Sequence, residues 1–100
     1  ILNSSDRPDA IFCVNDHCAS GVLYAAQQLG ISVPDQLAIC GFSDALLARI
    51  TTPMLTTVEQ HGAEIGQRAM GCLLKRLEGD QTTPHTDMVS TDLIVRGTTR

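Results

Sequence analysis

The apolar residues between positions 10 and 42 change their spacing twice, and this change constrains the fold more than any other feature. Residues 10–14 form a short, wholly apolar run, which is typical of a strand buried on both faces. From about His17 to Gly30 the apolar residues follow the spacing of an amphipathic helix, and residues 37–42 form a second apolar run. Strand, helix and strand joined by short loops predict a right-handed βαβ unit with parallel strands.

The rest of the chain continues with alternating elements. Residues 45–50 predict a short helix, and residues 55–58 predict a further strand. Residues 59–78 predict a second long helix that Gly79 ends, and a last strand is expected around residues 88–95. The apolar stripe of the long helix comprises Ile65, Ala69, Cys72, Leu73 and Leu77. This order of elements predicts an α/β fold with a parallel sheet and flanking helices.

Polar pairs follow both predicted parallel strands. Asn15 and Asp16 come directly after the first strand, and Ser43 and Asp44 come after the second. Because the carboxyl ends of parallel strands share one edge of a sheet, these side chains should converge on one crevice, where such sheets bind ligands. The alternative is that Asp16 and Asp44 merely cap the following helices, at about 1 kcal/mol each. Capping does not require Asn15 as well, and both roles can hold together.

Composition and motifs argue against several classes of function. The net charge of −4 disfavours binding along a phosphate backbone, and 3% aromatic residues offer little for base stacking. No run approaches the roughly 20 apolar residues of a membrane span, so we expect no membrane contact. The sequence contains no GxGxxG, GxxxxGK[ST], GxSxG or HExxH motif, and no Cys or Ser has a base at motif spacing. We therefore expect neither an enzyme nor a cofactor.

The four cysteines are Cys13, Cys18, Cys40 and Cys72. Three of them lie in apolar periodic segments, where a free thiol packs as a small hydrophobe, and reduced thiols suit a cytoplasmic protein. Zinc bound by Cys13, His17 and Cys18 is the sharper alternative. Against it, Cys13 lies within a strand and no second CxxC-type pair could complete a tetrahedral site. We therefore predict no metal site.

Several stretches together resemble the carboxyl-terminal core of LacI/GalR-type transcriptional regulators. Residues 7–44 (RPDAIFCVNDHCASGVLYAAQQLGISVPDQLAICGFSD) resemble the family pattern P-x-A-[IV]-x-x-x-N-D-x-x-A-x-G and the G-[FY]-D-[DN] motif that follows it. The later stretches PMLTTVEQ, EIGQRAMGCLLKRLEG and STDLIVRGTT resemble family motifs as well. Each motif alone is weak, but their order and spacing are specific, and the match spans essentially the whole chain.

The resemblance implies a periplasmic-binding-protein-like fold of type I, in which this chain is a fragment of a two-subdomain effector-binding module. Residues 1–57 would form the βαβ core of the carboxyl-terminal subdomain. Residues 58–92 would cross to the amino-terminal subdomain and supply a helix and a strand there, and residues 93–100 would return. Residues 57–60 would then be a hinge crossing. The DNA-reading helix-turn-helix would lie outside this chain, in agreement with its acidic charge.

The resemblance also implies site residues. Asn15 and Gln60 match family positions that contact a small-molecule effector, and Asp16 and Asp44 complete the predicted effector-binding set with Ser43. Ser43 departs from the family, because many members have an effector-binding aspartate there. Serine removes the repulsion of an anion and can donate a hydrogen bond to it, which favours a sugar acid or sugar phosphate over a neutral sugar. Asp44 argues against an anion unless it turns away to cap the following helix.

A homodimer is implied as well, because residues 18–28 and 46–54 match the family's dimer-forming surface. Tyr24 supports this independently, since it lies off the core stripe and should be exposed with Ser20 and Gln27. The alternative is a lone surface tyrosine. The predicted interface comprises Ser20, Leu23, Tyr24, Gln27 and Ile50.

The leading functional prediction is the effector-sensing and dimerising part of a cytoplasmic transcriptional repressor, which binds operator DNA through a helix-turn-helix absent from this chain. Effector binding would shift the population of subdomain arrangements and so change operator affinity. Two alternatives remain: a periplasmic sugar-binding protein of a transport system, and an α/β enzyme using Asp16 or Asp44 as a base. Free cysteines and the ending LIVRGTT favour the regulator.

Overall fold

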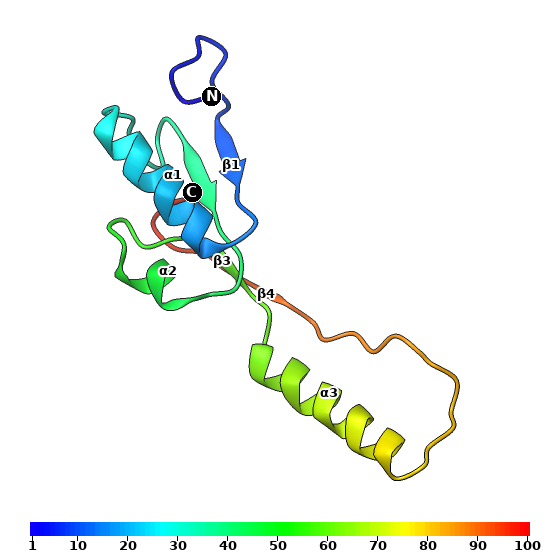
Figure 1. Cartoon of the computed structure of the whole chain (residues 1–100). Helices are drawn as coiled ribbons and strands as arrows, with labels where there is room; N and C mark the ends of the chain where they lie inside the picture. The colour runs from blue at the N-terminus through cyan, green and yellow to red at the C-terminus, as the bar shows by residue number, and fades with distance from the viewer.

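The computed structural model describes residues 1–100 and shows an elongated molecule (Figure 1). Its principal extents are 59 × 26 × 19 Å. The radius of gyration is 18.3 Å, whereas a compact domain of this length would have about 13 Å. The elongation arises because one helix, α3 (Gly62–Leu77), projects away from the rest of the chain.

The predicted βαβ unit is confirmed. It consists of β1 (Ala10–Phe12), α1 (Asp16–Gln28) and β2 (Ala38–Cys40). The two strands pair in parallel, with Ile11 opposite Ile39. Gly30 ends the helical segment with a φ of +68°, a conformation that glycine adopts without a Cβ penalty.

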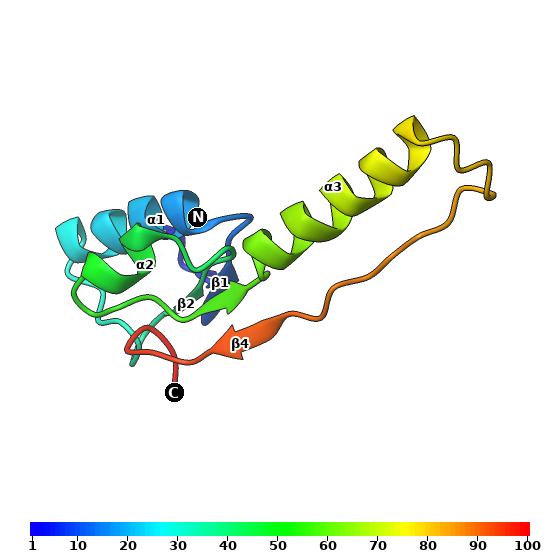
Figure 2. The ribbon, with the colours of Figure 1, turned by 90° about the horizontal axis from the view of Figure 1, so that it is seen from below.

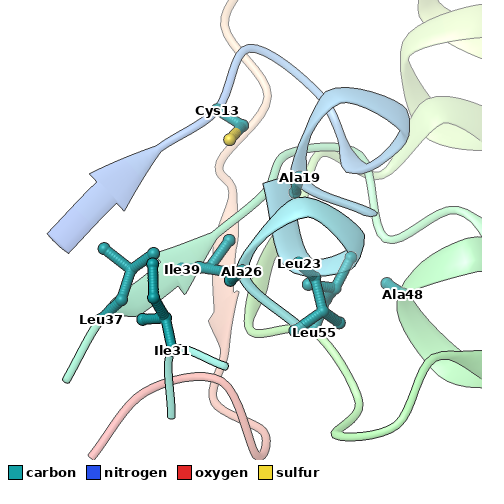
Figure 3. Packing of buried hydrophobic residues seen from close by; sticks show 9 residues of the cluster. All are labelled: Cys13, Ala19, Leu23, Ala26, Ile31, Leu37, Ile39, Ala48 and Leu55. Atoms are coloured by element: carbon teal, nitrogen blue, oxygen red, sulfur yellow. The ribbon is translucent and has the colours of Figure 1, made fainter. Parts of the chain in front are cut away.

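A small apolar core joins α1 to the strands. Leu23 and Ala26 on one face of α1 lie against Ile39 of β2 and Leu55, as Figure 3 shows. The short helix α2 (Leu46–Ile50) packs beside α1, and both helices lie on one side of the strands (Figure 2). The nine buried apolar residues are Cys13, Ala19, Leu23, Ala26, Ile31, Leu37, Ile39, Ala48 and Leu55.

The expected burial of residues 10–14 on both faces is wrong for this chain. Cys13 is buried, but its neighbours Phe12 and Val14 are largely exposed. The physical reason is that β1 pairs only with β2 and that α1 covers only one face of the pair. The opposite face of β1 has no covering layer in these 100 residues.

The second half of the chain forms a pair of antiparallel strands that carry α3. They are β3 (Thr57–Glu59) and β4 (Asp92–Ile94), and Val58 lies opposite Leu93. The prediction of a helix from residue 59 is wrong by three residues, because Glu59 pairs in the strand and His61 adopts a left-handed φ of 53° before the helix begins. The last strand is likewise shorter than expected.

The apolar stripe of α3 is not buried. No residue of the helix is buried, and Ile65, Leu73 and Leu77 are all exposed. Arg68 ties the helix to the returning chain, with Nη1 2.9 Å from Asp87 Oδ1. None of the helices combines the length and the hydropathy that a membrane span needs.

Candidate functional site

Three strands place the candidate site at one edge of the α/β unit. β1 and β2 run parallel, and a parallel bridge between Cys40 and Thr56 gives the segment entering β3 the same direction. Their carboxyl ends therefore share one edge, where Asn15 follows β1, Ser43 follows β2 and Gln60 follows β3. The strand ends that precede these polar residues therefore lie together, and the convergence of the polar side chains on one ligand crevice stays a prediction.

Backbone hydrogen bonds hold the three strand ends together. The Asp16 N–H donates to the carbonyl oxygen of Phe42 at 3.1 Å, and the Ser43 N–H donates to that of Val58 at 2.8 Å. Ser43 therefore takes part directly in a contact between two strand ends, and Asn15 is next to Asp16, which takes part in the other. Gln60 lies two residues beyond Val58 and is partly buried.

Asn15 caps α1. It has extended backbone angles, φ −160° and ψ 170°, and its Oδ1 accepts a hydrogen bond from the Cys18 N–H at 2.8 Å. This is the geometry by which an N-cap side chain satisfies one of the free N–H groups of a helix. The Nδ2 amide is left as a hydrogen-bond donor at the edge of the sheet.

Asp16 is a buried structural residue and does not cap α1, which corrects its assignment as a cap; its contact with the effector stays a prediction. Its side chain is 1% exposed. Its Oδ2 accepts from the Ala45 N–H at 2.7 Å, and its Oδ1 accepts from the Thr57 hydroxyl at 2.5 Å. Gly41 is required beside it, because a Cβ there would lie 2.1 Å from Asp16 Oδ1. The carboxylate therefore joins α1 to the segments after β2 and at the start of β3.

Asp44 does not cap α2 either. The N-cap of α2 is Ala45, and no side chain caps that helix. The Asp44 carboxylate instead meets two arginines, with Oδ1 2.6 Å from Arg96 Nη1 and Oδ2 2.5 Å from Arg49 Nη2. The Arg96 guanidinium holds the pKa of Asp44 below its usual value; burial opposes this shift, and Arg49 adds to it. The negative charge of Asp44 is therefore compensated within the chain.

Arg96 and the threonines around it lie at this edge but were not among the predicted site residues. Thr98 is buried, donates to the Ile39 carbonyl oxygen at 2.6 Å and accepts from the Thr56 N–H at 2.8 Å. These contacts insert the end of the chain beside β2. The available signal for Arg96 was its position as a basic residue directly after the apolar residues of the last strand.

Strands β3 and β4, which connect the α/β unit to α3, are linked by side-chain contacts where they leave that unit. His61 Nε2 lies 2.7 Å from Asp92 Oδ2, on the opposite strand. The His61 N–H donates to Glu59 Oε1 at 2.7 Å, which supports the left-handed turn between β3 and α3. Gln60, between these two residues, is therefore carried by a short segment with several internal contacts.

The predicted dimer surface is mostly exposed. Tyr24 is 64% exposed and Ile50 on α2 is exposed as well, whereas Leu23 is only 3% exposed. Leu23 therefore contributes to the core, and its place in the interface stays a prediction. Gln27 Nε2 donates to the Thr52 carbonyl oxygen at 2.8 Å, which joins α1 to the chain after α2. A shallow hollow at this place is lined by Ser20, Leu23, Tyr24, Gln27, Thr51 and Thr52.

The cysteines are all free. Burial raises the pKa of the Cys13 thiol, and the nearby Cys18 and Cys40 add to the shift. Burial likewise raises the pKa of the Cys40 thiol, with a contribution from Asp16. No three His, Cys, Asp or Glu side chains come together in an arrangement that could hold a metal ion, and Cys13, His17 and Cys18 form no such group.

Comparison with known sequences gives a consistent family signal. The family model for the periplasmic binding protein-like domain matches residues 2–99. The HTH-type transcriptional repressor CytR of Escherichia coli (strain K12) is 37% identical over 100 residues, which cover 100% of this chain and 29% of CytR. The ribose operon repressor of Haemophilus influenzae is 36% identical over 96 residues, which cover 96% of this chain and 29% of that repressor. The chain thus spans less than a third of the length of these relatives.

Solved structures give the same signal for the fold. A LacI-family transcriptional regulator from Sanguibacter keddieii superposes with a TM-score of 0.90 at 34% identity, over 97% of this chain and 38% of that one. A LacI-family regulator from Lactobacillus casei with bound sucrose superposes with a TM-score of 0.79 at 32% identity, over 92% of this chain and 34% of that one. The predicted periplasmic-binding-protein-like α/β fold is confirmed.

Proposed function

The chain belongs to the periplasmic binding protein-like domain family, in its LacI-type branch, and on this premise we propose that it is the effector-binding and dimerising part of a cytoplasmic transcriptional repressor. The compared relatives are named as repressors, which favours this function over a sugar-binding protein of a transport system and over an enzyme. Operator binding would belong to parts of the intact protein outside this chain.

The observation that carries the proposal is the shared edge of three parallel strand ends, with Asn15, Ser43 and Gln60 along it. Ligands of parallel α/β sheets bind outside such edges. An effector bound there would contact Gln60 on the crossing segment as well as residues of the α/β unit. Its binding would therefore favour one arrangement of the two subdomains, and the change in population would alter operator affinity.

The proposal includes the division of the chain between two subdomains. Residues 1–57 would form the core of one subdomain, residues 58–92 would cross to the other, and residues 93–100 would return. The elongated shape and the antiparallel pairing of β3 with β4 support this division. The exposed apolar stripe of α3 supports it too, because such a face is normally buried against another layer.

For the effector we propose a sugar acid or sugar phosphate. The Ser43 hydroxyl and the Asn15 Nδ2 amide can donate to an anionic oxygen, and the amino end of α1 presents its positive dipole to the same edge. Asp44, which would repel an anion, is paired with Arg49 and Arg96. The sucrose complex of the Lactobacillus casei regulator supports a sugar framework for the ligand.

Calorimetric titration of the intact protein with matched sugars tests this proposal. D-gluconate and D-glucose 6-phosphate should bind more tightly than D-glucose. Ser43→Asp should reverse the preference, because a second carboxylate about 4 Å from the anion costs about 4 kcal/mol at an effective dielectric constant near 20. Ser43→Ala is the matched control and should weaken binding of the acids without creating a preference for glucose. A parent that prefers glucose, or a Ser43→Asp variant with an unaltered preference, would contradict the charge argument.

We also propose that the intact protein forms a homodimer through α1 and the region of α2. The exposed side chains of Tyr24 and Ile50 lie on the contacting helices α1 and α2, and Ser20 and Gln27 line one hollow together with Tyr24. Exposed aromatic and aliphatic side chains bordered by polar groups are typical of interfaces.

A further inference from the structure

The turn that carries Ser43 and Asp44 is strained and held in place by its neighbours. Both residues have left-handed φ angles, 107° and 48°, which residues other than glycine rarely adopt. The Ser43 N–H donates to the Val58 carbonyl oxygen at 2.8 Å, and the Asp44 N–H donates to Thr57 Oγ1 at 3.3 Å. Such a conformation persists only where surrounding contacts over-determine it.

The Asp44 carboxylate provides the side-chain anchor of this turn. Its two oxygens lie 2.6 Å from Arg96 Nη1 and 2.5 Å from Arg49 Nη2. The Asp44 and Arg96 side chains are 5% and 14% exposed, whereas that of Arg49 is 58% exposed. The Arg49 contact has the geometry of a hydrogen bond, whereas the Arg96 contact is an ion pair without one. Because ion pairs shielded from water interact more strongly than solvent-screened ones, Arg96 is nevertheless the principal partner.

Arg96 is itself fixed to the chain segment that enters β3. Its backbone N–H donates to Thr56 Oγ1 at 2.8 Å, and its Nη1 donates to the Leu55 carbonyl oxygen at 3.1 Å. It also follows the last residue of β4 by two positions. One side chain thus connects the returning strand, the segment before β3 and the turn at the candidate ligand edge.

We propose that Arg96 is a positioning residue for the ligand site. It holds Asp44, and through it the Ser43 hydroxyl, in the binding geometry, and it links this geometry to the β3–β4 pair. Removing Arg96 leaves a nearly buried carboxylate without its main counter-charge, so that the strained turn relaxes. The effect on ligand affinity rests on the proposed function, whereas the anchoring of the turn does not.

Hydrogen–deuterium exchange of the intact protein without added sugar tests the anchoring. Arg96→Met should accelerate exchange in the peptide covering residues 42–47 about tenfold or more, because the N–H groups of the turn lose their fixed acceptors. Arg49→Met removes the exposed partner of the same carboxylate and should accelerate exchange at most about threefold. Asp44→Asn, a nearly isosteric change, should accelerate exchange as much as Arg96→Met does. If Arg96→Met fails to fold, Asp44→Asn takes its place in the test.

Exchange that is equal in the parent and in Arg96→Met, or in Asp44→Asn where the former does not fold, would overturn the anchoring. A larger effect of Arg49→Met than of Arg96→Met would overturn it as well. These outcomes do not depend on whether any sugar binds.

Binding of D-gluconate to the same variants separates positioning from a general structural role. Arg96→Met should weaken binding about tenfold in the parent, but less than about twofold in an Asp44→Asn background, because the two residues act through one contact. If Arg96 acted only through Leu55 and Thr56, the loss would be equal in both backgrounds, which would overturn the positioning role. A parent that does not bind gluconate contradicts the proposed ligand class, and the exchange measurement then decides on Arg96 alone.

Discussion

Replacement of Asp16 by alanine tests whether this carboxylate stabilises the fold or binds the effector. The side chain is 1% exposed and accepts two hydrogen bonds, from the Ala45 N–H at 2.7 Å and from the Thr57 hydroxyl at 2.5 Å. Hydrogen bonds to a charged group contribute about 1.5–3 kcal/mol each. We therefore expect Asp16→Ala to lower the free energy of unfolding by about 3–6 kcal/mol, the sum of two such bonds.

Two milder variants make the expectation specific. In Asp16→Asn the side-chain oxygen can still accept from Ala45, and the new NH₂ group can donate to Thr57 Oγ1, so the loss should be only about 1–2 kcal/mol. Thr57→Val removes one of the two donors and should cost about 1.5–3 kcal/mol, the contribution of one such bond. The order of the three variants follows directly from the number of hydrogen bonds that each retains.

Urea unfolding of the intact protein, followed by circular dichroism, measures these losses. Sugar binding by the same variants is measured by calorimetry at a temperature at which all of them are folded. The reasoning is refuted if Asp16→Ala costs less than about 1 kcal/mol and yet weakens sugar binding tenfold or more. Asp16 would then be an effector contact, as the sequence analysis assumed.

The remaining predictions concern the dimer surface and the rim ion pairs. Tyr24→Asp should make the intact protein monomeric in sedimentation at concentrations where the parent is dimeric, because a desolvated, unpaired charge costs several kcal/mol. The control Tyr24→Phe should stay dimeric. A Tyr24→Asp variant that stays dimeric would place the interface elsewhere. Because the pKa of Asp44 is lowered in the fold, its ion pairs stabilise the protein above the usual aspartate pKa and lose this contribution as the pH falls through the lowered value. Between pH 7 and about pH 3, the free energy of unfolding should therefore fall less steeply for Asp44→Asn than for the parent. Parallel curves would show that the ion pairs of Asp44 do not contribute to the stability of the fold.

The sequence predicts the local elements well where the apolar spacing and a stop residue agree. Helix α1 matches its expected range because one face, with Leu23 and Ala26, is apolar and Gly30 can adopt the left-handed φ that ends it. The edge shared by Asn15 and Ser43 could also be predicted, since parallel strands leave no other geometry for their carboxyl ends. These features depend only on chain direction and on spacing within about 30 residues.

Features decided by distant partners could not be predicted. Asn15 and Asp16 are both good N-cap residues, and local preference does not decide between them. The hydrogen bonds to the Asp16 carboxylate decide the matter, and their donors are Thr57, 41 positions away, and the Ala45 N–H, 29 positions away. These donors draw the Asp16 carboxylate into the interior and leave the capping role to Asn15. Residues 59–61 likewise fit a helical pattern, but pairing of Glu59 with Asp92 overrides it.

Burial was the least predictable feature, and the wrong predictions of burial share one cause. Phe12 on β1 and Val14 just after it, and the stripe with Ile65 and Leu73 on α3, lie in segments with the pattern of buried residues and are exposed. Periodicity shows which face of an element is apolar, but it does not show what covers that face. Since α1 and α2 cover only one side of the strands and no residue of α3 is buried, the uncovered faces need layers that these 100 residues do not supply. This supports the proposed arrangement, in which the rest of a larger regulator completes both subdomains around the shared edge.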